Sequence, residues 1–412
     1  METQELMRSR RILSNDSFVL GGLSAVLSIA ILAICYSQID PAFNTNDDTA
    51  IQLILSGSTF GEPDAHVVFS NYVLCVPIMW LFRLVPGVPW WAFMQVALIG
   101  FAIACVIHTT LLTLKSMSAL HLILALIGLV GMILGIFIRP ILSLGFTCTS
   151  CILGASACYT RAIHLSNGHC IASVATDTAL LILSYCVRSE SGLVALLFFI
   201  VVSMAEPGWR KASKLQADTK SLIGLTMPLL IPATLIASVQ IAHDVAYSAD
   251  SWQEFYSINH ARSSYMDYPH NSYDENPAAY EELGWSRELQ TMVDSWFFLD
   301  SRVTEDSFLA ASLLQQVANE NRYVVWEYVL QDGRYYSHVV YGFITAIILI
   351  SAACMLSDKK GTAIAGASVT TVTLALIYYL EYRGRVPTRA LYTVLFPAIL
   401  GCIGLACRDL ST

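Results

Sequence analysis

Long apolar runs alternate with short polar segments along most of the chain. A helix that crosses a membrane needs roughly 20 apolar residues, so the pattern predicts an all-α polytopic membrane protein with about 10–11 transmembrane helices. The apolar runs lie at roughly Phe18–Tyr36, Val67–Leu84, Trp90–Leu114, Ala119–Ile138, Ile141–Tyr159, Ile171–Val187, Leu193–Ala205, Leu222–Ala242, Val339–Leu356, Thr362–Leu380 and Ala390–Ala406.

Composition narrows the class of protein further. Hydrophobic residues make up 55% of the 412 residues and charged residues 13%, whereas an average soluble domain carries roughly 25% charged residues. The net charge of −8 leaves no basic surface for DNA or RNA. These values exclude an ordinary soluble protein, a disordered chain and a nucleic-acid binder.

Cysteine placement argues against a disulfide-stapled domain. The chain has eleven cysteines, and the long polar stretch 243–338 contains none of them. A secreted domain held by disulfides would carry cysteines in that stretch. Cys148 and Cys151 have the spacing of a redox or metal site, but the apolar run around them offers no other ligands. We interpret both as packing residues.

The lysines orient the chain across the membrane. By the positive-inside rule, the lysine-bearing segments Glu206–Lys220 and Ser357–Gly361 are cytoplasmic. The stretch 243–338 has no lysine and carries sixteen acidic residues against five arginines, so we expect it outside. Three arginines precede the Phe18 run, which we interpret as a signal anchor with a cytoplasmic N-terminus. The loop 37–66 is then external.

This orientation predicts three parts of the chain. Residues 1–242 form an N-terminal transmembrane domain that includes the external loop 37–66. Residues 243–338 form an acidic external helical cap, and residues 339–412 form the C-terminal transmembrane helices. Because the charged residues gather mostly at one membrane face, we expect the function to lie at the outer surface.

The predicted topology has a parity conflict between residues 67 and 138. With Lys115 cytoplasmic, the three apolar runs of this region must start and end outside, and three full crossings cannot do so. We expect Val67–Leu84 to be re-entrant, interfacial or split, because Pro77 interrupts it.

The external cap has the pattern of several helices. Its apolar residues recur at three- and four-residue spacing in Ser251–Tyr265, Pro277–Trp296 and Thr304–Tyr323. Ser286 and Thr304 stand where N-caps are expected. The many aromatic residues of the segment suit a cap near the membrane interface.

The external loop 37–66 contains a predicted short helix. Asp48–Ser56 has helical spacing and ends at Gly57, a usual helix terminator. Ile51, Ile54 and Leu55 fall on one face, so we expect this helix to rest along the membrane surface.

The same loop carries the first candidate chemistry. Asp47 either caps the short helix or, with Asp48, acts as a general base or an acceptor-binding carboxylate. Adjacent carboxylates repel, which raises the pKa of one of them. Glu62, Asp64 and His66 follow within twenty residues and are further candidates for substrate binding.

Arginines on the predicted external side need an explanation, because external loops are normally poor in them. A guanidinium group matches phosphate geometry, so we expect these residues to bind a substrate phosphate. The alternatives are salt bridges and interfacial snorkelling, and for Arg188 with Glu190 also a mutual structural pair. The arginines concerned are Arg139, Arg188, Arg383, Arg385 and Arg389.

Two further hypotheses concern the cap and a metal. Arg262 borders the acceptor site or is an ordinary surface residue. The carboxylate oxygens of Asp47, Asp48 and Asp64 could serve as ligands of a divalent cation. We do not expect the function of the protein to require a cofactor. No Gly-rich phosphate loop or other catalytic signature motif is present.

The first external loop also carries a family resemblance. Members of the GT-C superfamily of membrane glycosyltransferases, which includes protein O-mannosyltransferases and aminoarabinose transferases, have an acidic motif right after the first transmembrane helix. This chain resembles an uncharacterised bacterial multi-pass branch grouped with them. The similar stretches are Asn46-Asp47-Asp48, Ser56-Gly57, Gly61-Glu62-Pro63-Asp64-Ala65-His66, Asn71, Trp90-Trp91, Ser143-Leu144-Gly145-Phe146-Thr147 and Tyr382–Arg389.

The resemblance implies a GT-C-like bundle and a specific reaction. It implies a sugar donor linked to polyprenyl phosphate and an extracytoplasmic acceptor, which is a cell-surface glycan, a lipid or a protein. The site would face outward from the plasma (inner) membrane, with Asp47 or Asp48 as base. Two rivals are a transporter or flippase of lipid-linked sugars and a non-catalytic assembly subunit. A transporter predicts paired charges within facing helices.

Overall fold

A computed structural model describes residues 2–114, 117–167, 170–206, 219–268, 270–314, 360–383 and 387–411. The chain divides into two compact units, and each is described by itself. The membrane unit comprises Met1–His243, Phe343–Leu374 and Arg389–Thr412. The cap unit comprises Asp244–Gly342 and Ala375–Thr388. Within the described ranges both units are built almost entirely of helices.

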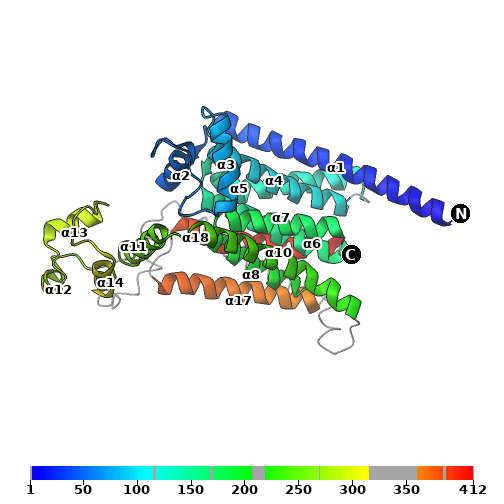
Figure 1. The fold of residues 1–412 in the computed structure, drawn as a ribbon. Helices are drawn as coiled ribbons and strands as arrows, with labels where there is room; N and C mark the ends of the chain where they lie inside the picture. Colours follow the sequence, from blue (N-terminus) through cyan, green and yellow to red (C-terminus); the bar gives the residue numbers. More distant parts are fainter. Residues whose placement is uncertain are drawn as a thin grey trace. The chain divides into compact units, whose positions relative to one another are not determined.

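The membrane unit is a helical bundle (Figure 1). α1 packs on α4, and α6 contacts α4, α7 and α8. The helices are α1 (Glu2–Gln38), α3 (Tyr72–Leu84), α4 (Trp90–Leu114), α5 (Ala119–Leu142), α6 (Phe146–Asn167), α7 (Ile171–Val187), α8 (Ser189–Ser203), α10 (Thr219–Ala246), α17 (Lys360–Tyr382) and α18 (Thr388–Ser411).

Six helices of the described residues are long and apolar enough to cross a membrane, which supports the prediction of an all-α membrane protein. The side of the membrane on which each helix ends stays a prediction. The candidate spans are Phe18–Gln38, Trp90–Leu114, Leu120–Leu142, Thr226–Ala246, Lys360–Leu380 and Thr388–Arg408.

α3 is too short to cross a bilayer. Its 13 residues extend about 20 Å, whereas the hydrocarbon core is about 30 Å thick. Figure 1 shows α3 running across the direction of α1 and α4. Because α7 and α8 are also shorter than the candidate spans, the expectation that Val67–Leu84 is the run that does not make a full crossing stays a prediction. The start of α3 is capped by Asn71, whose side chain accepts a hydrogen bond from the backbone N–H of Val73.

α7 and α8 form a close pair joined at Arg188, which ends one helix and begins the other. Gly192 makes the close approach possible. A Cβ atom at this position would lie 2.4 Å from the Cα atom and 2.7 Å from the amide nitrogen of Tyr185. Since these are backbone atoms of a packed helix, no larger residue fits without separating α8 from α7.

The first loop folds onto the bundle through β1 (Ala42–Phe43), which pairs in parallel with β2 (Ser143–Leu144) just before α6. The expected short helix is present as α2 (Asn46–Ser56), and Gly57 ends it with φ of 79°. The N-cap is Thr45, so Asp47 is not the helix cap that one alternative expected.

The apolar face of α2 is used differently from the sequence-based expectation. Ile51 and Leu55 are buried, and α2 contacts α3 and α4. The helix therefore packs its apolar face on the protein, and the expectation that this face rests along the membrane surface is wrong. A protein neighbour buries these side chains because the β1–β2 pairing draws the loop onto the bundle.

Between residues 250 and 314, the described part of the cap unit forms the helices α11 (Asp250–Met266), α12 (Pro277–Glu282), α13 (Arg287–Asp294) and α14 (Glu305–Leu313) around an aromatic core. Ser286 and Thr304 are N-caps, as the sequence predicts. The predicted helical stretch 277–296 contains two helices, in agreement with the N-cap expected at Ser286, and Gly284 adopts a φ of 76° between them. The predicted residues 315–323 lie outside the described ranges. The core residues are Ala261, Tyr265, Tyr280, Trp285, Leu289, Val293, Phe308 and Ala311.

Candidate functional site

Asp48 joins three segments at the end of the membrane unit where α2 lies, which we call the α2 end. Its Oδ1 accepts hydrogen bonds from Trp91 Nε1 at 3.0 Å and Gln95 Nε2 at 2.9 Å, both on α4. The backbone N–H of Phe146, the first residue of α6, donates to the same oxygen at 3.1 Å. Oδ2 accepts from Thr45 Oγ1 at 3.1 Å. The carboxyl group therefore ties α2 to α4 and α6.

Burial separates Asp48 from substrate. The residue is 0% exposed, and burial raises the pKa of its carboxyl group against the opposing effect of its hydrogen bonds. A substrate hydroxyl does not reach a group in this position. Asp48 is therefore a positioning residue in this structure, and its accessible neighbour is the candidate for direct chemistry.

Asp47 is that neighbour, and it is 30% exposed. Its Oδ2 lies 4.0 Å from Nη1 of Arg389, in the first turn of α18. One turn further on, Thr393 lies 3.3 Å from the Sγ atom of Cys151 on α6 and 3.2 Å from the Oγ atom of Ser191 on α8. Asp47 and Arg389 thus meet where α2, α6, α8 and α18 come together.

Arg188 approaches the same place from the α7–α8 junction. It forms the mutual ion pair that one alternative predicted, with Nε 2.8 Å from Glu190 Oε2. Its guanidinium carbon lies 5.1 Å from the ring centre of Phe69 and 5.2 Å from that of Phe146. Since the Phe146 backbone binds Asp48, one residue connects Arg188 with the buried carboxyl group.

The structure thus brings five charged residues together at the α2 end. We call them the carboxylate–arginine cluster: Asp47, Asp48, Arg188, Glu190 and Arg389. The sequence had singled out all five, Arg389 as one of the three arginines of the loop before the last apolar run.

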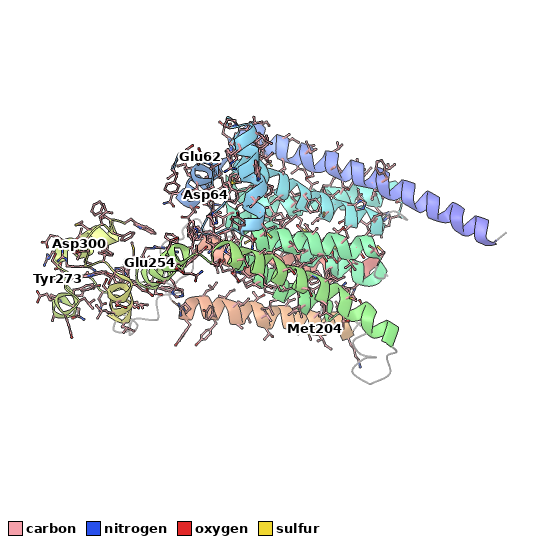
Figure 2. The ribbon with its side chains drawn as sticks, in the orientation of Figure 1. Glu62, Asp64, Met204, Glu254, Tyr273 and Asp300 are labelled. Atoms are coloured by element: carbon pink, nitrogen blue, oxygen red, sulfur yellow. The ribbon has the colours of Figure 1, made fainter. Side chains whose placement is uncertain are left out.

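Asp64 and His66 form a pair in the loop after α2. Asp64 Oδ1 lies 2.6 Å from His66 Nδ1 and accepts the backbone N–H of His66 at 3.0 Å. The N–H of Asp64 donates to the carbonyl of Ile54, so the loop folds back on α2. Gly57 permits this return, because a Cβ atom there would lie 2.6 Å from the carbonyl carbon of Glu62. Figure 2 shows Glu62 and Asp64 at the α2 end.

Three of the remaining predicted arginines are among the described residues. Arg139 is exposed in the last turn of α5. Arg262 belongs to the cap unit, where its Nη2 donates to Asn259 Oδ1 at 2.8 Å. Arg383 also belongs to the cap unit and donates to the hydroxyl group of Tyr268 at 2.9 Å. Arg385 lies outside the described residues.

A second set of ionisable residues, which the sequence analysis missed, is buried near the other end of the membrane unit, where Met204 lies (Figure 2). Asp177 on α7 is 2% exposed, accepts a hydrogen bond from Thr160 Oγ1 at 2.7 Å and lies 3.0 Å from His164 Nδ1. Arg161, 1% exposed, donates to Ser203 Oγ at 2.9 Å.

These residues are two charged groups that lie away from the α2 end, and the membrane face at which most charges gather stays a prediction. Arg161 is 15 residues along α6 from Phe146, a distance of about 22 Å. Nothing in the local sequence marked Arg161 and Asp177 as interacting residues, because each is a single charged residue next to or within an apolar run. Only the packing of α6 against α7 and α8 buries both.

The described residues contain no group of three or more His, Cys, Asp or Glu side chains that could hold a metal ion. Asp48 uses its oxygens for protein donors instead. Cys148 and Cys151 are buried free thiols in α6, in agreement with their interpretation as packing residues.

No protein-family model, curated protein or solved structure matches this chain. The resemblance to GT-C glycosyltransferases therefore stays a prediction.

Proposed function

We propose that this protein is a membrane glycosyltransferase. It moves a sugar from a polyprenyl-phosphate donor to a hydroxyl group of an extracytoplasmic glycan, lipid or protein. One observation carries the proposal: Asp47, partly exposed, lies 4.0 Å from Arg389 at the α2 end. A base next to a guanidinium group suits this reaction, because a proton leaves the acceptor while negative charge grows on the departing phosphate.

The roles of the residues follow from their exposure. The acceptor oxygen bonds to the anomeric carbon as the bond from that carbon to the phosphate oxygen breaks, with inversion. Asp47 takes the hydroxyl proton, and the bonding electrons leave with polyprenyl phosphate. Arg389 and Arg188, 33% and 23% exposed, stabilise that phosphate. The Asp64–His66 pair binds the acceptor.

The test uses the purified chain in lipid nanodiscs with polyprenyl phosphates that carry radiolabelled hexoses or pentoses. Transfer to added glycans and lipids and release of free sugar are both counted. We expect Asp47→Asn to lose about a hundredfold or more of the activity, as removal of a general base does. Asp40→Asn is the matched control, because Asp40 is an exposed carboxylate just before β1.

Two outcomes contradict the proposal at different levels. Full activity of Asp47→Asn removes Asp47 as the base. Absence of any donor turnover by the wild type removes the enzyme class itself. For the phosphate role, Arg389→Gln should raise KM for the donor, and Arg389→Lys should restore part of the loss because it keeps the charge.

A transporter of lipid-linked sugars is the second candidate function. Asp177 with His164, and Arg161 beside Ser203, favour it, because ionisable residues buried within a membrane bundle often mark a transport path. The test is movement of a fluorescent polyprenyl-phosphate sugar across liposomes that contain the protein. A transporter would lose this movement in Asp177→Asn and keep it in Asp47→Asn, and an enzyme would show no such movement.

A further inference from the structure

Asp177 on α7 is an ionisable group inside the membrane unit that the proposed glycosyl transfer, which uses the α2 end, does not employ. The residue is 2% exposed. Its Oδ1 accepts a hydrogen bond from Thr160 Oγ1 at 2.7 Å and lies 3.0 Å from Nδ1 of His164, both on α6. Its Oδ2 is fully buried and has no hydrogen-bond partner among the described residues. A buried carboxylate with one unpartnered oxygen calls for an explanation.

His164 connects this carboxyl group with the outside of the bundle. It stands in the last turn of α6, and its side chain is 12% exposed whereas that of Asp177 is 3% exposed. The Nδ1 atom faces the carboxyl group, so this nitrogen carries a proton whenever Asp177 is ionised. The other ring nitrogen, Nε2, is then unprotonated and can accept a proton.

Thr160 can follow a change of charge on Asp177. Its hydroxyl oxygen lies 2.7 Å from Oδ1 of Asp177 and 3.2 Å from the carbonyl oxygen of Ala157, and its single proton serves one acceptor at a time. If Oδ1 takes a proton, the new O–H can donate to Nδ1 of His164 while Thr160 turns to the carbonyl group. Oδ1 therefore keeps a hydrogen-bond partner in both protonation states.

Two effects act on the charge of Asp177 in opposite directions. An ionised carboxylate whose Oδ2 lacks a donor is costly in an apolar interior, and this cost falls when the group is neutral. The attraction of Arg161, one turn before His164 on α6, favours the ionised form. Arg161 also interacts with Glu206, just after α8, so Asp177 is not its sole counter-charge. A carboxyl group under such opposing effects is suited to gain and lose a proton.

The other ionisable groups that face this pair come from α4 and α6. Cys105 on α4 and Cys158 on α6 lie close enough to Asp177 for an electrostatic interaction, and buried thiols in apolar surroundings stay neutral. His108 on α4 interacts in the same way with His164. Two positive imidazolium groups would repel each other, so we expect His164 to be charged only while His108 is neutral.

The other helices that pack on α7 add no further charge beside Asp177. α3 lies next to Cys186 and α10 next to Tyr185, eight or nine residues along α7 and so about 12 Å away. α8 has no ionisable residue after Glu190, in its first turn. Arg408 of α18 donates to a carbonyl group just after α8. The charge of Asp177 therefore depends mainly on α4, α6 and the segment after α8.

We propose that Asp177 and His164 form a reversible proton-binding site, loaded from the end of the membrane unit where Met204 lies (Figure 2). A proton from water binds Nε2 of His164, and the proton on Nδ1 passes to Oδ1 of Asp177. The products are a carboxylic acid and a neutral imidazole, with one proton added. Because the site loses its negative charge, the attraction on Arg161 weakens, and Arg161 holds α6 to Ser203 of α8.

The test is infrared difference spectroscopy on the full chain in lipid vesicles. It follows the carbonyl stretch of protonated carboxyl groups as the pH falls from about 8 to about 5, the range in which histidine titrates. We expect a band that grows on acidification, disappears in Asp177→Asn and shifts in frequency in Asp177→Glu. Asp40→Asn removes an exposed carboxylate, and Asp48→Asn removes the buried carboxyl group of the α2 end. Both control variants should keep the band.

His164→Gln tests the entry of the proton. Glutamine can still donate to Oδ1 of Asp177 but cannot take up a proton. We expect the band to appear several-fold more slowly after a rapid drop in pH, and unchanged kinetics would remove His164 from the site.

Three results overturn the proton site itself. Absence of a pH-dependent carboxyl band in the wild type shows that Asp177 does not change its charge. A band that is unaltered in both Asp177→Asn and Asp177→Glu belongs to another group. A band that responds to added sodium or potassium ions at constant pH assigns the site to a metal cation. None of these results bears on glycosyl transfer, because the measurement uses no sugar donor.

Discussion

Trp91 and Asp48 form the central contact of the α2 end: the indole N–H donates to Oδ1 over 3.0 Å, and both residues are fully buried. Gln95, one turn further along α4, adds a second bond to the same oxygen. Because Asp47 is the preceding residue on α2, the bonds that fix Asp48 also fix the position of Asp47 beside Arg389. The buried acid thus supports the exposed one.

Variants of Asp48 separate this supporting role from catalysis. Asparagine keeps the shape of Asp48 and an oxygen that can accept from Trp91 and Gln95, while it removes the ionisable group. We expect Asp48→Asn to keep the fold and most of the activity. Asp48→Ala leaves the buried donors of Trp91 and Gln95 unpaired, which costs about 1–3 kcal/mol for each donor. Thermal unfolding in detergent measures the stability.

Trp91→Phe is the control for the same contact, because it removes one donor and keeps an aromatic ring. It should destabilise the protein by about 1 kcal/mol, less than Asp48→Ala does. If Asp48→Asn folds like the wild type but loses activity completely, Asp48 takes part in the chemistry directly and the supporting role is wrong.

Gly192 should tolerate no side chain. A Cβ atom would overlap the backbone of Tyr185 on α7, so Gly192→Ala must separate α7 from α8. We expect a loss of about 2–3 kcal/mol, as in overpacked cores. Gly131→Ala in α5 is the matched control, because nothing lies within 4 Å of the added Cβ atom. Alanine there should be neutral or slightly stabilising, and equal destabilisation by both variants would contradict the close packing.

Stability of the cap unit should depend on pH through His270. Burial lowers the pKa of His270, but hydrogen bonds with Asp294 and the carbonyl of Tyr268 outweigh burial, and the net pKa is raised. The contribution is therefore fully present below the unfolded pKa of about 6.5 and is lost as the pH rises through the folded value. Because Asp294 is partly exposed, we expect less than about 1 kcal/mol.

Urea unfolding between pH 5.5 and 8.5, followed by near-ultraviolet circular dichroism, measures this effect. His270→Gln removes the titrating group and Asp294→Asn removes its ion-pair partner, so each should flatten the dependence on pH, His270→Gln more completely. An unchanged slope in both variants would assign the pH dependence to other groups.

The buried charges near Met204 should act as a unit. Asp177→Leu removes the carboxylate that Thr160 and His164 contact and a negative charge that attracts Arg161, and breaking a buried ionic network in this way costs about 3–5 kcal/mol. The double variant Arg161→Met, Asp177→Leu should recover part of that loss, because it removes the charge left behind. Additive losses in a double-mutant cycle would show that the two residues do not interact.

The local pattern of apolar residues and helix caps predicts much of the architecture. The apolar runs predicted most of the helix positions, because a bilayer demands long stretches of apolar residues whatever their neighbours are. Gly57, Ser286 and Thr304 marked helix ends, since capping and left-handed turns depend on one or two residues.

Other features depended on residues far apart in the chain. Asp47 and Asp48 look equivalent in the sequence, yet one is fully buried and the other 30% exposed. What distinguishes them is Trp91 and Gln95 on α4 and Arg389 on α18. Burial and ion pairing depend on which helices meet, and no local pattern records that.

The sequence by itself therefore determined that this is a helical membrane protein and which charged residues interrupt its helices. The tertiary structure alone decided which of those charges meet. It joined Asp47 with Arg389 and buried Asp177 beside His164. The physical reason is the range over which each effect acts. Hydrophobic patterning and helix capping depend on a few neighbouring residues of the sequence. The properties of a carboxylate depend instead on every group within a few ångströms, however distant that group is in the chain.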